Sequence, residues 1–205
     1  MTKNRLAHGE LVHLLAVCMS IFSCGQRSVS KTEPQKPNAQ IPHALEFVLQ
    51  SPAFEDFGRI PDRYTGKGED VSPPLTWHNF PAGTRSFALI VDDPDAPGGT
   101  FTHWLIYNLA PVYRGLPGLA EAVPKSESLT GELVHHNGGR QLKNDFGKVG
   151  YSGPMPPPGK LHHYVFQLYA LDQMLSTSIT GKKQLRDALP GHILDQTKLT
   201  GTFQR

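Results

Sequence analysis

The sequence predicts a mainly β protein, an antiparallel sheet or sandwich with a few peripheral helices. Its 20 Gly and 18 Pro are spread along the 205 residues instead of forming a repeat. Such a distribution is typical of chains with many turns between short strands. Runs rich in Val, Ile, Phe, Tyr and Leu recur between these turns, and those residue types favour strands. Helical periodicity is weak before residue 182.

The expected elements follow one another along the chain. Four runs are expected as strands: Leu45–Gln50, Ser86–Asp92, Phe101–Leu109 and His162–Leu171. The last part of the chain is expected to form two short helices and a final strand: Lys182–Leu189, Gly191–Thr197 and Leu199–Phe203.

The N-terminal residues 1–23 have the pattern of a signal peptide, with a basic start and an apolar stretch too short to span a bilayer. Ile21-Phe-Ser-Cys-Gly25 resembles a bacterial lipobox, in which Cys24 becomes the lipidated first residue. An ordinary secretory peptide cut nearby is the alternative. Residues 24–44 are polar, aperiodic and contain proline, which predicts a flexible tether. We therefore expect an exported bacterial protein, periplasmic or anchored as a lipoprotein, whose domain covers residues 45–205.

The composition excludes several classes of function. The formal net charge is +2 and no dense Lys/Arg run is present, so no nucleic-acid partner is expected. Both cysteines, Cys18 and Cys24, precede the domain, which therefore has neither a disulfide nor a thiol nucleophile. Zinc-type spacing of His and Cys is also missing. We expect no metal, no cofactor, and membrane contact only through a lipid anchor.

The first candidate stretch joins the second and third expected strands. Asp93-Pro-Asp-Ala-Pro97 contains two prolines, which fix φ and remove two backbone donors. The loop is thus stiff and presents carboxylates just beyond a strand end. His103 begins the next apolar run, and strict alternation places it on one face with Leu105, Tyr107 and Leu109. This position is at the rim of the core.

The second candidate stretch is a Gly/Pro loop that leads into the strand starting at His162. His162 and Tyr164 project from the same face of that strand, whereas His163 projects from the other. Imidazole N–H and phenol O–H groups donate to phosphate oxygens, and Asp93 is suited to accept from a histidine and fix its tautomer. Together these groups predict a small-anion site. From spacing alone, satisfied histidines at the core rim remain the alternative.

The two stretches resemble the signature blocks of the phosphatidylethanolamine-binding protein family, specifically its bacterial Raf-kinase-inhibitor-like branch. The residues that match the two blocks are Asp93-Pro-Asp-Ala-Pro97 with His103-Trp104, and Gly150-Tyr-Ser-Gly153 with Pro154, Pro157, Gly159 and His162-His-Tyr164. Further similar segments are Glu69–Trp77, Pro81–Thr84, Gly191–Leu194 and Leu199–Arg205. The resemblance covers about residues 45–205 in consistent order.

This resemblance implies a large central antiparallel sheet, a smaller second sheet, peripheral helices and an anion pocket at one end. It assigns to the pocket Asp93, His103, His162 and Tyr164, with Pro97 and Gly153 as walls. The sequence departs from the family pattern at His163, where many members have Arg, and at Phe101, where some carry Trp near the pocket mouth. We expect His163 to face away from the pocket, whereas Phe101 leaves the ligand preference open.

The expected function is non-enzymatic binding of a small anionic, phosphate-like group, such as a phosphorylated metabolite, a lipid headgroup or a peptide. A protein partner, in particular a kinase or protease that the chain modulates, and a homodimer are further options. The alternative is a hydrolase with Asp93 and His162 as the acid/base pair, although an obvious nucleophile is lacking. Asp145-Phe-Gly147 matches a kinase motif by coincidence, because the other kinase motifs are missing.

Overall fold

The computed structural model describes residues 45–111, 118–119, 121–123, 125 and 138–205. The expected signal peptide, the tether and Cys24 lie outside these residues. The described strands and helices are β1 (Val48–Gln50), η1 (the 3-10 helix Asp62–Tyr64), β2 (Leu75–His78), β3 (Ser86–Asp93), β4 (Phe101–Leu109), β5 (Gly118–Leu119), β6 (Arg140–Gln141), β7 (His162–Leu171), α1 (Lys182–Ala188) and β8 (Ile193–Phe203).

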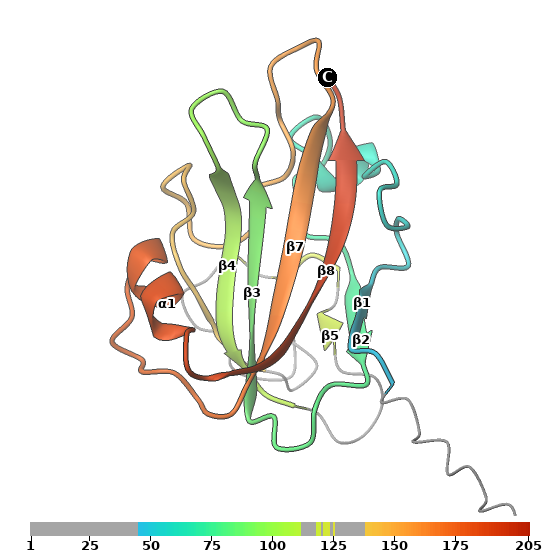
Figure 1. The fold of residues 1–205 in the computed structure, drawn as a ribbon. Coiled ribbons are helices and arrows are strands. Elements are labelled where there is room, and N and C mark those ends of the chain that lie inside the picture. The colour runs from blue at the N-terminus through green and yellow to red at the C-terminus, as the bar shows by residue number, and fades with distance from the viewer. Residues whose placement is uncertain (1–44, 112–117, 120, 124, 126–137) are drawn as a thin grey trace, which may run out of the picture. The chain divides into compact units, whose positions relative to one another are not determined.

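The strands form two antiparallel sheets (Figure 1). The larger has the order β6-β4-β3-β7-β8, and the smaller has the order β1-β2-β5. The mainly β fold with a large and a small antiparallel sheet is therefore confirmed. Because β3 ends where β4 and β7 begin, the loops that join these strands meet at one end of the large sheet (Figure 1).

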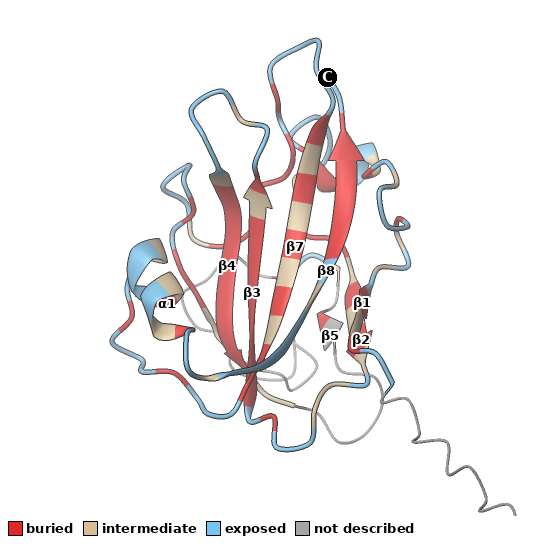
Figure 2. Ribbon diagram, viewed as in Figure 1, coloured by how far each residue is buried: buried red, intermediate tan, exposed pale blue. Residues whose placement is uncertain are grey.

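The large sheet is buried on both faces around β3 and β4 (Figure 2). The inner cluster is the set of buried side chains on the face toward the small sheet, where the Trp77 and Phe87 rings meet edge to face at 5.3 Å. The outer cluster, on the opposite face, includes Leu105 and Tyr107 of β4 and Leu185 of α1. The apolar run of β3 follows from this double burial, because each face meets a different apolar layer.

Two irregularities in β4 change the alternation that the sequence predicts. Val91 pairs with Trp104 while Asp92 pairs with Thr102, so His103 is an extra residue opposite β3. Leu89 pairs with Ile106 while Phe87 pairs with Leu109, so β4 has a second extra residue between Ile106 and Leu109. Such a bulge redirects a side chain and shifts the phase of the strand. The predicted common face of His103, Leu105, Tyr107 and Leu109 is therefore wrong: Leu105 and Tyr107 belong to the outer cluster, whereas Leu109 belongs to the inner one. His103 instead packs against the inner-cluster residue Tyr164.

The expected helix at Gly191–Thr197 is also wrong, because β8 begins at Ile193 and pairs with β7 along its length. Its first six residues are exposed or half-buried, as Figure 2 shows. They therefore lack the apolar alternation that predicts a strand. Backbone pairing with β7 determines their structure instead.

The short strands β2, β5 and β6 were not expected, since two to four residues give little periodic signal.

Candidate functional site

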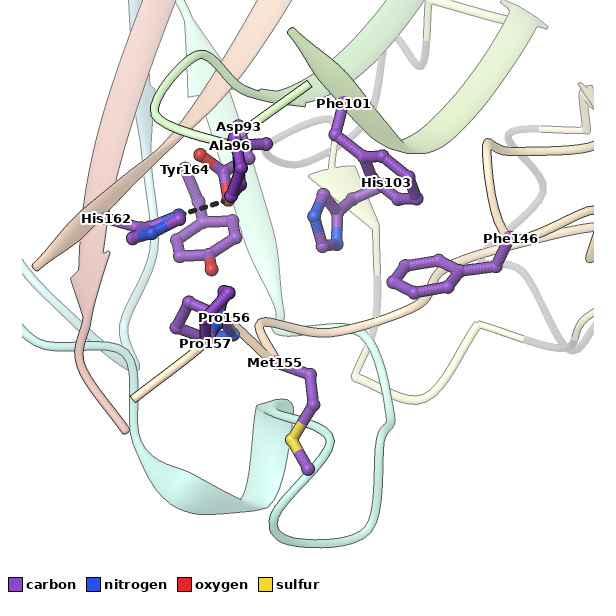
Figure 3. A pocket seen from close by; sticks show the side chains of 11 residues that line it. Asp93, Ala96, Phe101, His103, Phe146, Met155, Pro156, Pro157, His162 and Tyr164 are labelled. Carbon is purple, nitrogen blue, oxygen red and sulfur yellow. Dashed lines mark hydrogen bonds and ion pairs between the residues drawn. The ribbon is translucent and has the colours of Figure 1, made fainter. Parts of the chain in front are cut away.

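A cavity of about 170 Å³ opens at the end of the large sheet where β3, β4 and β7 meet. Four polar side chains from these strands line it together with an apolar wall (Figure 3). The polar residues are Asp93, His103, His162 and Tyr164, and the apolar ones are Ala96, Pro97, Phe101, Phe146, Met155, Pro156 and Pro157. The structure thus brings together five of the six residues that the sequence assigned to the pocket.

Asp93 and His162 form a buried pair in the cavity. The Nδ1 atom of His162 lies 2.7 Å from Oδ2 of Asp93, and both side chains are about one-twentieth exposed. The other carboxylate oxygen, Oδ1, accepts the backbone N–H of Asp95 at 2.9 Å. Since a carboxylate only accepts, Nδ1 of His162 carries the proton. Asp93 therefore fixes both the orientation and the tautomer of the ring.

His103 is held by the backbone instead of by an acid. Its Nδ1 lies 2.7 Å from the carbonyl oxygen of Ser152, and its ring meets that of Tyr164 edge to face at 5.1 Å. Burial lowers the pKa of His103, although the Ser152 carbonyl and the charge of Asp93 act in the opposite direction. The ring is therefore neutral near pH 7.

Tyr164 is only 1% exposed, and its hydroxyl has no hydrogen-bond partner among the described residues. Burial raises the pKa of this hydroxyl, and the nearby Asp93 carboxylate, which is close to it but not in hydrogen-bonding geometry, raises the pKa further. The group is therefore a neutral donor at any ordinary pH. A buried hydroxyl without a partner in the protein requires an explanation, and a bound water or ligand oxygen supplies one.

Two phenylalanine rings pack against His103 and form a wall of the cavity with it. Phe101, His103 and Phe146 make mutual edge-to-face contacts, with ring centroids 4.7 to 5.4 Å apart. Phe146 is 46% exposed and so stands at the mouth of the cavity. Sequence reasoning missed Phe146 and Met155, because both reach the cavity from a loop without strand alternation. The acidic residue that precedes Phe146 indicates a turn in the sequence. It does not indicate that this turn borders a pocket.

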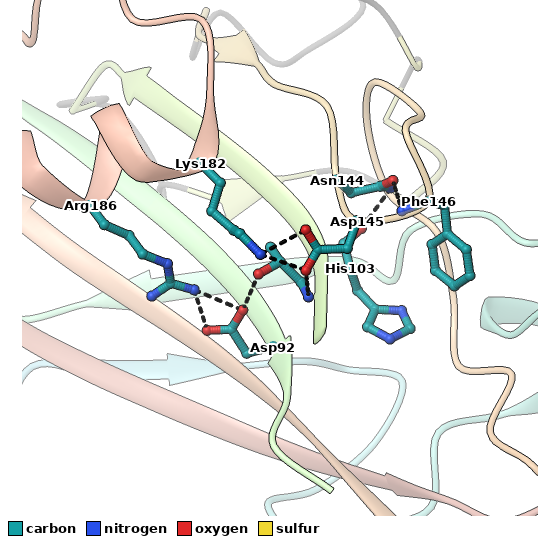
Figure 4. A network of polar contacts seen from close by, with 8 residues as sticks. Asp92, His103, Asn144, Asp145, Phe146, Lys182 and Arg186 are labelled. Atoms are coloured by element: carbon teal, nitrogen blue, oxygen red, sulfur yellow. Dashed lines mark hydrogen bonds and ion pairs between the residues drawn. The ribbon is translucent and has the colours of Figure 1, made fainter. Parts of the chain in front are cut away.

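A polar network holds the Phe146 loop against the start of β4 (Figure 4). The Asn144 side chain is buried, and its Nδ2 lies within 3.1 Å of the carbonyl oxygens of His103 and Gly150. Asp145 accepts the backbone N–H of Thr102 at 2.7 Å and forms an ion pair with Lys182 of α1 at 2.6 Å. The helix therefore helps to fix the aromatic wall, although it contributes no residue to the cavity.

Gly153, expected as a wall, does not line the cavity. It lies behind the wall, where its backbone approaches that of the segment at Tyr64. A Cβ at this position would lie 2.3 Å from the carbonyl oxygen of Tyr64. Its N–H donates to Oδ1 of Asp70 at 2.6 Å. The glycine therefore serves the close approach of two loops, which sequence alone does not distinguish from a ligand contact.

His163 lies outside the cavity and contacts the neighbouring loop. Its Nδ1 is 2.7 Å from Oδ2 of Asp95, and both side chains are about two-fifths exposed. This hydrogen bond lowers the pKa of Asp95. The two adjacent histidines thus have separate partners, Asp93 at the end of β3 and Asp95 in the loop that follows it. Within the described ranges, no helix is long and apolar enough to cross a membrane.

Comparison with known proteins identifies relatives of the whole domain. The profile of the family described as "Phosphatidylethanolamine-binding protein" matches residues 50–204. A UPF0098 protein of Methanothermobacter thermautotrophicus is 45% identical over 158 residues, which cover 77% of this chain and 98% of the relative. LppC of Mycobacterium tuberculosis, whose name describes it as a lipoprotein, is 35% identical over 205 aligned residues, with coverage of 93% and 92%.

Two crystal structures have the same fold. One is a phosphatidylethanolamine-binding protein homologue of Chlamydia trachomatis, with a TM-score of 0.67 and 36% identity over 78% of this chain and 97% of that one. The other is YbcL of Escherichia coli, described as a member of the mammalian family, with a TM-score of 0.66 and 28% identity over 78% and 99%. The profile match, the curated relatives and the fold agree: the chain belongs to the phosphatidylethanolamine-binding protein family.

Proposed function

We propose that the domain binds a small anionic, phosphate-like group in the cavity formed by Asp93, His103, His162 and Tyr164, without transforming it. The observation that carries this proposal is the Tyr164 hydroxyl, a buried donor that makes no hydrogen bond with the described part of the chain. A phosphate oxygen is a suitable acceptor for it. Hydrogen bonds to a charged group contribute about 1.5–3 kcal/mol each before ordering costs. A bare anion would accordingly bind with roughly micromolar to millimolar affinity.

The rest of the ligand meets an apolar wall. Phe101, Phe146 and Met155 line the side of the cavity that opens outward, and Phe146 and Met155 are 46% and 44% exposed. A ligand that joins the anionic group to an apolar or aromatic part would cover these side chains. Phosphorylated metabolites, lipid headgroups with their adjoining chains and phosphorylated peptides share this chemistry. The name of the family, which refers to a phospholipid, is consistent with this chemistry.

Calorimetric titration with phenyl phosphate at pH 6 tests this proposal. We expect saturable binding by the wild type and a loss of at least about tenfold in His162→Gln, because one charge-assisted contact is removed. His192→Gln is the matched control: His192 also pairs with an aspartate, Asp172, but beyond the opposite end of β7. If the wild type shows no binding, or if both variants weaken it equally, the cavity is not the binding site.

Hydrolysis is the second candidate, and one observation favours it. The Asp93–His162 pair leaves Nε2 of His162 without a partner among the described residues, which is the arrangement of an oriented general base. As far as the structure describes the chain, the lining contains no Ser, Thr, Cys or Lys that would act as a nucleophile. Release of phenol from phenyl phosphate by the wild type, lost in His162→Gln and kept in His192→Gln, would replace binding by hydrolysis as the function.

The proposed location is outside the cytoplasm, with Cys24 as a lipidated first residue. The alignment with LppC supports this, since it covers 93% of this chain and so includes N-terminal residues that lie outside the profile match. Intact mass and membrane fractionation of the expressed full chain test it. We expect a diacylglyceryl mass increment and membrane association, both lost in Cys24→Ala. A membrane-free wild type of unmodified mass would contradict lipidation.

A further inference from the structure

The two cavity histidines are oriented alike. His103 donates from Nδ1 to the Ser152 carbonyl, and His162 donates from Nδ1 to Asp93, each at 2.7 Å. A neutral imidazole has one N–H and one lone pair. In the neutral form, Nε2 of each ring is therefore a bare acceptor, and neither Nε2 makes a hydrogen bond with the described residues. Both rings line the cavity (Figure 3), and a ring in its neutral form offers a ligand the lone pair of Nε2 and not an N–H group.

The charge of the cavity is unusual for an anion site. Among the described residues, no Lys or Arg lines it, and Asp93 is its only carboxyl group. In the described part of its lining, Tyr164 supplies the one side-chain O–H donor, against the bare Nε2 of the neutral His103 ring and the carboxylate of Asp93. A fully ionised oxyanion carries only acceptors and would face these lone pairs directly. A partly protonated oxyanion carries an O–H that one of the nitrogens accepts.

The charged groups around the cavity do not change this balance of hydrogen-bond donors and acceptors. The ionisable groups near His103 are Asp93, Asp92 and Asp145. Asp92 is paired with Arg186, and Asp145 with Lys182, so these two acids are already neutralised by α1 (Figure 4). Near His162 lie Asp93 and Asp95, and Asp95 is bonded to His163. Burial keeps the His103 ring neutral near pH 7, as its lowered pKa indicates.

We infer that the cavity takes its anion together with a proton, as a hydrogen-bond-donating monoanion, and rejects oxyanions that carry no acidic proton. This inference rests on the proposed anion-binding function and specifies its ligand class. Phosphate monoesters have a second pKa near about 6 and so supply the required species under ordinary conditions. Sulfate esters do not. A bare Nε2 selects for the protonated ligand, because two acceptors that face each other without a proton between them are costly in a buried site.

A matched pair of ligands tests the inference. The phenyl phosphate monoanion and phenyl sulfate have the same single charge and nearly the same shape, but only the phosphate has an acidic proton. By calorimetry at pH 6 we expect phenyl phosphate to bind at least about tenfold more tightly than phenyl sulfate. At pH 7.5, titrations in two buffers of different ionisation enthalpy should show uptake of about one proton per phosphate bound, since the free monoester is then mostly a dianion.

The variant His103→Gln replaces a bare nitrogen by an amide that can present an N–H. We expect it to bind phenyl sulfate more tightly and so to reduce the preference for phosphate, whereas His192→Gln keeps the wild-type preference. If His103→Gln does not fold, the wild-type proton count decides. Equal affinity for the two ligands with no proton uptake would overturn the inference and leave anion binding intact. Absence of binding by either ligand at any pH would instead overturn the proposed function.

Discussion

At the scale of a single residue, removal of the Tyr164 hydroxyl should separate an effect on binding from an effect on stability. Because the hydroxyl has no partner among the described residues, its removal leaves no acceptor unsatisfied. We expect Tyr164→Phe to change the free energy of unfolding by less than about 1 kcal/mol, while weakening phenyl phosphate binding about 10- to 100-fold. Urea denaturation and calorimetry measure the two effects.

Tyr107→Phe is the control for this residue. The Tyr107 hydroxyl is also buried, but it donates to the Ile179 carbonyl at 3.2 Å in the outer cluster. Its loss leaves that carbonyl unsatisfied, so we expect a lower free energy of unfolding and unchanged binding. Unchanged binding in Tyr164→Phe would show that the hydroxyl does not reach the ligand.

At the scale of the elements, the Phe146 loop determines the apolar side of the site. We expect Phe146→Ala to weaken binding of phenyl phosphate about five- to tenfold, which corresponds to roughly 1 kcal/mol of buried apolar area. Binding of inorganic phosphate should stay unchanged, since it does not reach the rim. Calorimetry with both ligands measures the difference. Met174→Ala, which truncates a similarly exposed side chain in another loop, is the control. Equal losses for both ligands would place Phe146 at the anion itself.

The elements also show which parts of the fold a sequence can predict. β3, β4 and β7 were predicted within one residue, because each is a long apolar run bounded by turn residues. The bulge at His103 and the strand at Ile193–Thr197 were not, because backbone pairing with a neighbouring strand decides both. His162 and Tyr164 were placed correctly on one face, since β7 alternates from His162 to Ala170, as its burial pattern shows.

At the scale of the whole molecule, burial of a neutral histidine links stability to pH. Above about pH 6.5, His103 is neutral in both the folded and the unfolded chain. Below that pH the unfolded ring takes up a proton while the folded ring resists it, because its pKa is lowered. The free energy of unfolding should therefore fall as the pH drops below about 6.5, until the folded ring is protonated too. Urea denaturation at pH 7.5 and 5 measures this fall, and His103→Gln should show a smaller one. The same fall in both proteins would assign it to other groups.

The arrangement of the whole site was predictable only in part. Family resemblance indicated which residues meet, and the antiparallel order of β3, β4 and β7 explains why they do. The tautomers of His103 and His162 were not predictable, because they depend on where the Ser152 carbonyl and the Asp93 carboxylate lie after folding. Phe146 and Met155 were missed for the same reason, since loop packing brings them to the cavity.

The nitrogen resonances of the two cavity imidazoles test the central claim most directly. In the free protein at pH 7, side-chain ¹⁵N spectra should show both His103 and His162 protonated at Nδ1, and His103 bare at Nε2. Titration with phenyl phosphate should move the Nε2 resonances of both rings with one common saturation curve, while His192 stays unchanged. Nε2 resonances that do not respond to any oxyanion would contradict an anion site in this cavity.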